Sequence, residues 1–122
     1  PIEALAIGGR GRDEEIASAA GRLKALALEL NAPVVVTAQL PRLDRTRGDL
    51  RPRLDDFGAL GALAQHADVV VALFREEMYD PTTPGVEGAT ELLVLKNRNG
   101  PTGYVDLYFY KQWMRFEDMV ES

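Results

Sequence analysis

The chain has 122 residues, contains no cysteine and carries a formal net charge of -5. This length is typical of a single domain with a buried core, and the missing cysteines exclude disulfide bridges, cysteine-ligated zinc and thiol catalysis. The acidic balance excludes a uniformly basic nucleic-acid-binding module, so contact with DNA requires a local basic patch. No apolar run approaches about 18 residues, so we expect no membrane span.

The first quarter of the sequence predicts the end of a strand followed by a long helix. Residues 1–7 are mostly apolar and run into Gly8, as at the end of a strand that begins upstream. Asp13 is a candidate N-cap for a helix over residues 14–30. Apolar residues recur there at spacings of three and four and define one buried face, formed by Ile16, Ala20, Leu23, Ala27 and Leu30.

A second strand and a long loop follow this helix. Asn31 and Pro33 supply a stop signal, and residues 33–38 are a short, largely β-branched run without alternation. Such a run is typical of a strand that is buried on both faces of a parallel sheet. Residues 40–56 have little periodicity and predict a long mobile loop, a kind of segment that is usually functional or disordered in compact domains.

The second half of the sequence is richer in strands. The Asn99-Gly100 pair marks a hairpin turn between two of them. Strand, helix and strand followed by a hairpin predict an α/β fold with a mixed, mostly parallel sheet that ends in an antiparallel hairpin. The predicted elements are a helical turn over 60–66, a fully buried strand over 68–74, strands over 90–96 and 103–110, and a last short strand holding Trp113 and Phe116.

Three polar residues at predicted strand ends are candidates for phosphate chemistry. Lys96 and Arg98 are two apart, so both side chains leave one face of a strand just before a tight turn. Cations held there can stabilise charge in phosphoryl transfer, although two solvated charges beside a turn have the same spacing. Gln39 follows the predicted strand over 33–38, and ligands of open α/β sheets lie beyond the carboxyl ends of strands. A polar residue that only caps a loop would have the same position.

The loop over 40–56 is the basic patch of the chain. Arg47, Arg51 and Arg53 lie in it and could follow the phosphate backbone of DNA with salt-dependent affinity. The alternative is a solvated loop that neutralises itself, because Asp44, Asp49, Asp55 and Asp56 interleave with the arginines. The sequence has no glycine-rich loop followed by Lys and Ser or Thr, and the lone His66 has no partner at metal-ligand spacing, so we expect no metal site.

The run KNRNGPTG over residues 96–103 is the most specific motif of the sequence. Further segments agree with it in order, at residues 23–27, 29–35, 39–40, 51–52, 65–68, 74–77 and 113–116. Together they resemble the DnaB family of replicative DNA helicases over nearly the whole chain, least clearly over residues 1–12. The resemblance implies that residues 1–122 are the C-terminal part of a RecA-like ATPase domain, from a cytoplasmic ring hexamer driven by ATP and Mg²⁺.

The resemblance also implies roles for individual residues. The glutamine that matches Gln39 links nucleotide state to the DNA loops, and the residues that match Lys96 and Arg98 reach the ATP site of the neighbouring subunit, the arginine as its finger. Arg47, Arg51, Arg53 and Gly61 are the residues expected to contact single-stranded DNA. Neighbouring subunits are the expected protein partners, with primase and a helicase loader as further candidates.

Two departures from the family pattern limit these expectations. The phosphate loop and catalytic glutamate of the family lie upstream of the matching segment, so this chain alone is expected to bind no cofactor and hydrolyse no ATP. The family carries an Arg-Glu pair shortly before a glycine, whereas here Gly58 and Ala59 precede Gly61. That change keeps open a RecA-fold regulatory or scaffold protein that has lost DNA unwinding.

Overall fold

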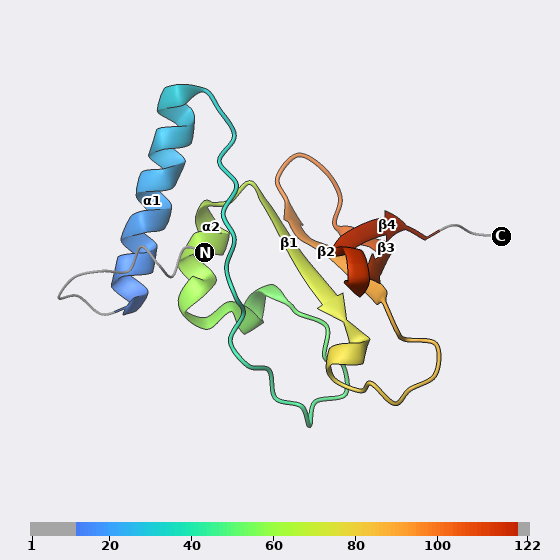
Figure 1. Cartoon of the computed structure of the whole chain (residues 1–122). Coiled ribbons are helices and arrows are strands. Elements are labelled where there is room, and N and C mark those ends of the chain that lie inside the picture. Colours follow the sequence, from blue (N-terminus) through green and yellow to red (C-terminus); the bar gives the residue numbers. More distant parts are fainter. Residues whose placement is uncertain (1–11, 120–122) are drawn as a thin grey trace. The chain divides into compact units, whose positions relative to one another are not determined.

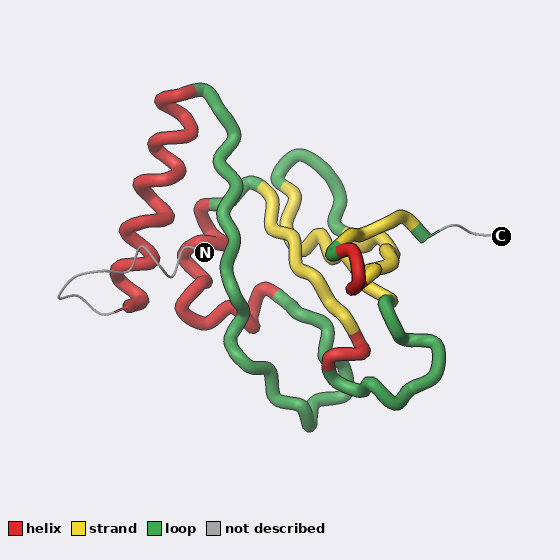
Figure 2. Tube along the Cα trace, viewed as in Figure 1, coloured by secondary structure: helices red, strands yellow, loops and turns green. Residues whose placement is uncertain are grey.

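The computed structural model describes residues 12–119, so the strand expected over residues 1–7 lies outside the described residues. The chain divides into two units, Pro1–Ala67 and Asp68–Ser122. Helices and one long loop make up the described part of the first unit, and strands make up most of the second (Figure 1, Figure 2). No helix within the described range is both long and apolar enough to cross a membrane.

Three helical segments build the first unit. They are α1 (Arg12–Leu30), the 3-10 helix η2 (Leu54–Leu60) and α2 (Gly61–His66), and each packs against the other two. Ile16 and Ala20 of α1 and Phe57 and Leu60 of η2 are buried and form the core of this unit. Burial does not extend along the whole predicted face of α1, because Leu30 is 61% exposed.

Local chemistry explains where α1 ends. The helix begins at Arg12, so Asp13 lies inside it and is not its N-cap as predicted. Asn31 adopts a left-handed conformation with φ of 50° and terminates the helix as predicted. The amide of Asn31 donates to the carbonyl of Leu28 at 3.4 Å and that of Ala32 to the carbonyl of Ala27 at 3.1 Å, which is a Schellman cap.

The strand predicted over residues 33–38 is not present as a strand. These residues have no regular secondary structure, and Val35 is 89% exposed. A strand is stabilised by hydrogen bonds to a neighbouring strand, and none of the described residues forms such a ladder with this segment. The β-branched composition therefore does not by itself specify a strand, which also needs a neighbouring strand with which to pair.

The second unit contains a four-stranded sheet in the order β1-β2-β3-β4. All three pairings are antiparallel, so the mostly parallel sheet predicted from the sequence is wrong for the described residues. The connections from β2 to β3 and from β3 to β4 are a few residues long, which suits antiparallel neighbours, whereas β1 joins β2 through the longer segment 76–88. The strands are β1 (Val69–Arg75), β2 (Ala89–Asn97), β3 (Gly103–Tyr110) and β4 (Arg115–Asp118).

Buried side chains lie on both faces of this sheet. Burial alternates along β1, where Val70, Ala72 and Phe74 are buried. The prediction that this strand is buried on both faces is therefore wrong, and the intervening Val71 is 48% exposed. Leu93 of β2 lies opposite Ala72 on the same face as these residues. Thr90 of β2 and Phe109 of β3 are buried on the other face of the sheet, where the ring of Phe109 packs against that of Phe116.

A buried carboxylate ties the loop after β1 to the start of β2. Glu77 accepts hydrogen bonds from the guanidinium of Arg75 at 2.5 Å and from the amide of Gly88 at 3.1 Å. Gly88 has φ of 74°, and a Cβ there would lie 2.6 Å from the ring of Tyr108, so no other residue fits. The amide of Phe109 donates to the carbonyl of Gly88 at 2.7 Å, which anchors the β2–β3 pair at this end.

Candidate functional site

The turn between β2 and β3 presents two of the predicted cations. Lys96 lies opposite Val70 in the β1–β2 ladder, and Arg98 directly follows the last residue of β2. The amide of Gly100 donates to the carbonyl of Asn97 at 3.3 Å, and the side-chain amide of Asn97 donates to the carbonyl of Pro101 at 3.2 Å. These bonds fix the backbone on which Arg98 is carried.

Asp68 holds Arg98 through both its backbone and its side chain. The amide of Arg98 donates to the carbonyl of Asp68 at 2.9 Å, and Nη1 of Arg98 lies 2.5 Å from Oδ1 of Asp68. The side chains of Arg98 and Asp68 are 49% and 51% exposed. An ion pair this exposed is weak and exchangeable, because water screens both charges. The guanidinium is therefore placed at the surface with a partner that another anion can replace.

Gln39, the third residue of the predicted set, lies in the extended segment after α1 and is exposed. It belongs to the first unit, whereas Lys96 and Arg98 belong to the second. The structure thus places the two cations on one hairpin of the second unit, whereas Gln39 lies in the first unit.

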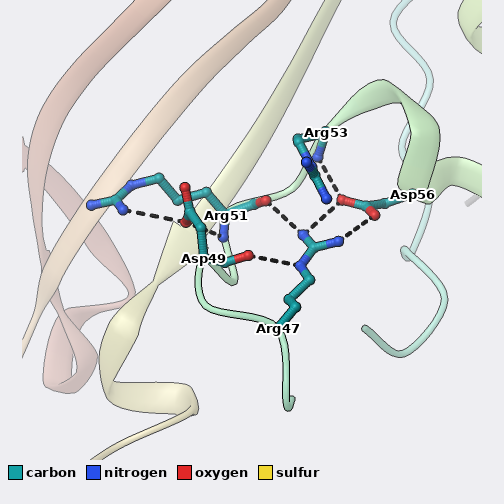
Figure 3. A network of polar contacts seen from close by, with 5 residues as sticks. All are labelled: Arg47, Asp49, Arg51, Arg53 and Asp56. Carbon is teal, nitrogen blue, oxygen red and sulfur yellow. Dashed lines mark hydrogen bonds and ion pairs between the residues drawn. The ribbon is translucent and has the colours of Figure 1, made fainter. Parts of the chain in front are cut away.

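The loop over residues 40–56, the arginine loop, is organised by the side chain of Arg47 (Figure 3). The guanidinium of Arg47 donates from Nη1 and Nη2 to both oxygens of Asp56, at 2.6 and 2.9 Å. It also donates from Nε to the carbonyl of Asp49 at 2.7 Å and from Nη2 to the carbonyl of Arg51 at 2.8 Å. All three guanidinium nitrogens of Arg47 are thus bonded to the protein itself, and the expected loop has a defined internal structure.

Asp56 is the acceptor at the centre of this network. Its Oδ2 also accepts the amide of Arg53 at 2.7 Å, and its own amide donates to the carbonyl of Arg53 at 2.9 Å, which starts η2. The hydrogen bond from Arg47 and the amide of Arg53 lower the pKa of Asp56 from 3.8 to about 2. The carboxylate is therefore charged throughout the neutral range and links the loop to the helix that follows.

The other two arginines of the predicted DNA-binding set remain at the surface. Pro52 is buried, and Arg51 and Arg53 on either side of it are exposed. Arg51 forms an ion pair with Asp49 at 3.4 Å, in which the two side chains are 48% and 68% exposed. In Figure 3 the guanidinium of Arg51 points away from the Arg47–Asp56 pair. The loop therefore contains one internally bonded arginine and two exposed ones.

Gly58 and Gly61, the two glycines after the loop, differ in whether the backbone requires a glycine. Gly58 has φ of 52° and ψ of -121° and forms the kink within η2, a conformation that strains any other residue. Gly61 has ordinary helical angles at the start of α2, and a Cβ there would meet nothing within 4 Å. Among the described residues a side chain at Gly61 would therefore meet no clash, although the amide of Gly61 already donates to the carbonyl of Gly58, whereas Gly58 is required by the fold.

Asp68 and Asp56 are the residues of these sites whose partners the sequence analysis did not assign. Asp56 lies three residues after Arg53 at the start of a helix, which is the spacing of a capping interaction and was an available signal. Asp68 pairs with Arg98 across 30 positions through the β1–β2 ladder, and no local spacing predicts such a contact. Within residues 12–119, no three His, Cys, Asp or Glu side chains come together as potential metal ligands.

Solved structures identify the class to which this fold belongs. The chain superposes on an ATPase domain with a TM-score of 0.85 and 33% identity, covering 95% of this chain and 40% of that one. The same values hold for a DnaB-like replicative helicase whose structure was determined to study its interactions with primase, of which 28% is covered. The fold is therefore that of RecA-like ATPase domains, as predicted from the sequence.

The family can be stated more closely. The family model for the DnaB-like helicase C terminal domain matches residues 3–118, and the chain belongs to this family. It is 41% identical over 111 residues to the replicative DNA helicase DnaB of Haemophilus influenzae and 42% identical over 109 residues to that of Leifsonia xyli. These matches cover 91% and 89% of the chain but only 24% of each relative, so the chain spans about a quarter of their length.

Proposed function

We propose that residues 1–122 form the C-terminal part of the motor domain of an ATP-dependent replicative DNA helicase. In this proposal Arg98 is an arginine finger that reaches the ATP site of a neighbouring subunit in a homo-hexameric ring, and Lys96 supports it. Gln39 senses the state of the nucleotide. The observation that carries the proposal is the placement of Arg98, half-exposed directly after β2 and held by Asp68 through backbone and side chain.

Charge and exposure support a role for Arg98 on a bound triphosphate. A finger contributes by stabilising the charge that develops on the transferred phosphoryl group, so its guanidinium must be fixed in position and free to exchange partners. The turn from Asn97 to Gly100 fixes the backbone, and the exposed carboxylate of Asp68 is an exchangeable partner. ATP and Mg²⁺ would be held by a phosphate loop elsewhere in a longer protein, since this sequence contains none.

The DNA-facing part of the proposal rests on the arginine loop. Arg51 and Arg53 are exposed, so their side chains could meet the phosphates of single-stranded DNA, and Gly61 at the start of helix α2 is a further proposed contact. Primase and a helicase loader are further partners in this proposal, and the protein acts in the cytoplasm.

A RecA-fold regulatory or scaffold protein is the second candidate. The observation in its favour is Gly58, whose backbone at φ of 52° forms the kink in η2 at a position where an arginine was expected. Loss of that side chain removes one contact to DNA. ATP hydrolysis that is stimulated by single-stranded DNA would support the helicase, and tight nucleotide binding without any response to DNA would support the regulator.

The decisive variant is Arg98→Ala in the full-length protein. We expect ATP turnover to fall by about a thousandfold or more, because fingers contribute on this scale, while nucleotide binding stays nearly unchanged. Arg22→Ala is the control, since Arg22 is an exposed arginine of α1. Turnover by Arg98→Ala at the rate of the Arg22→Ala control would remove the finger from the proposal.

A further inference from the structure

The arginine loop contains two kinds of arginine, and the difference assigns them different tasks. We propose that Arg47 and Asp56 are positioning residues that shape residues 49–56 so that Arg51 and Arg53 meet the phosphates of a nucleic-acid strand, and that Arg47 itself contacts no phosphate. The inference rests on the proposed DNA contact and adds which residues of the loop contact phosphate and which hold the loop in shape.

The contacts of Arg47 connect three points of the backbone. Its guanidinium bonds to the carbonyls of Asp49 and Arg51 and to the carboxylate of Asp56, so it spans the loop from one side to the other (Figure 3). Asp56 then accepts the amide of Arg53. Each exposed arginine is therefore attached at its own backbone to the same pair, Arg51 through its carbonyl and Arg53 through its amide.

Burial distinguishes this pair from an available phosphate-binding group. The side chains of Arg47 and Asp56 are 20% and 10% exposed, and their contact is bidentate. A phosphate could bind Arg47 only by displacing a carboxylate that already satisfies the planar fork of the guanidinium. Removing either partner would leave a largely buried charge unpaired, which is costlier than losing an exposed pair.

Arg51 and Arg53 have the opposite properties. The buried Pro52 anchors the chain between them, and both side chains are exposed. The contact of Arg51 with Asp49 is long, at 3.4 Å, and exposed on both sides, so an incoming phosphate can compete for it. A phosphate can therefore approach both side chains from solvent, provided that the Arg47–Asp56 pair keeps the backbone in place.

The test uses the full-length protein and a fluorescein-labelled oligothymidylate of about 20 nucleotides, with affinity measured by anisotropy across a series of salt concentrations. Each phosphate contact to a single strand contributes about 0.7 to the salt slope. We expect Arg51→Gln and Arg53→Gln each to lower the slope by about 0.7. Arg47→Lys and Asp56→Asn should lower it by up to about 1.4, because both exposed contacts are misplaced.

The charge-conserving and charge-adding variants make the result decisive. If Arg47 touched phosphate directly, Arg47→Lys would retain the slope, and Asp56→Asn would tighten binding because a negative charge is removed near DNA. Positioning requires the opposite, weaker binding in both. Asp44→Asn is the matched control, since Asp44 lies in the same loop but its carboxylate caps Thr46, with Oδ1 accepting the amide at 2.9 Å and the hydroxyl at 2.6 Å.

Amide hydrogen exchange without DNA tests the positioning role of Arg47 and Asp56 separately from the phosphate contacts of Arg51 and Arg53. Peptides over residues 49–57 should exchange faster in Arg47→Lys and Asp56→Asn than in the wild type or in Asp44→Asn. Unchanged exchange in Asp56→Asn would overturn the positioning role. Unchanged DNA binding in Arg51→Gln and Arg53→Gln would instead overturn the phosphate contact, while the ATPase test of Arg98 decides the helicase proposal independently.

Discussion

The two arginine–aspartate pairs of this chain have the same chemistry and opposite environments. Arg47 and Asp56 meet through two hydrogen bonds with side chains that are 20% and 10% exposed. Arg98 and Asp68 meet through one nitrogen and one oxygen, and both side chains are about half exposed. Burial and the number of contacts, rather than the residue types, therefore decide whether an arginine is fixed in the structure or available to a ligand.

This difference follows from where each pair lies. Asp56 is at the start of η2, close to the buried Phe57, so its partner is drawn towards the core of the first unit. Asp68 immediately precedes β1, and Arg98 lies in the turn that follows β2, where the sheet ends. A turn at the end of a sheet exposes its side chains, and a loop packed along a helix can cover them.

The largest expected effect is the coupling energy within the Arg47–Asp56 pair. A double-mutant cycle with Arg47→Ala and Asp56→Ala should give about 2 kcal/mol, because hydrogen bonds to charged groups contribute about 1.5–3 kcal/mol when little exposed. Urea unfolding of the chain, followed by the circular dichroism of α1 and α2, measures it. The same cycle on Arg98 and Asp68, followed by Trp113 fluorescence, should give less than about 1 kcal/mol. Equal couplings in the two pairs would contradict the contrast drawn from exposure.

The next effect is the acid dependence of the buried pair. The pKa of Asp56 is lowered from 3.8 to about 2 by the hydrogen bond from Arg47 and by the amide of Arg53. A lowered pKa in the folded state stabilises the fold above about pH 4, and this contribution is lost as the pH falls from about 4 to about 2. The difference in unfolding free energy between wild type and Asp56→Asn should therefore be constant near neutrality and shrink below pH 4. Comparison with Asp56→Asn removes the contributions of Asp44, Asp49, Glu77 and Asp80, whose pKa values are also lowered. A difference that does not change between pH 5 and pH 2.5 would contradict the assignment.

Much of the fold could be predicted from sequence because its signals are local. The apolar spacing of α1, its stop at Asn31 and the hairpin around residues 97–102 depend on residues close together in the chain, and the structure has all three. The family was also recognisable, since the run over residues 96–103 is a compact motif.

The failures share a different physical cause. The strand expected over residues 33–38 and the buried second face of β1 both need neighbours that the pattern of apolar residues does not specify. The pairing of Asp68 with Arg98 depends on the register of β1 against β2, which includes a bulge between Val70 and Val71. Local composition predicts conformation, and contacts between distant segments depend on tertiary arrangement.

The smallest expected effect is that of Asp68 on the proposed finger. Asp68→Asn removes the charge that pairs with Arg98 but keeps the carbonyl that accepts the Arg98 amide at 2.9 Å, so the turn stays in place. Because an exposed ion pair contributes at most about 1 kcal/mol, we expect ATP turnover of the full-length protein to change by no more than about fivefold. The change should fade at high salt, since ions screen exposed charges over about 10 Å at 0.1 M. A loss as large as that of Arg98→Ala would contradict the assignment of Asp68 as an exchangeable partner. Together with a large coupling for Arg47 and Asp56, a small and salt-sensitive effect here would support the conclusion that burial and the number of contacts separate the fixed arginine from the exchangeable one.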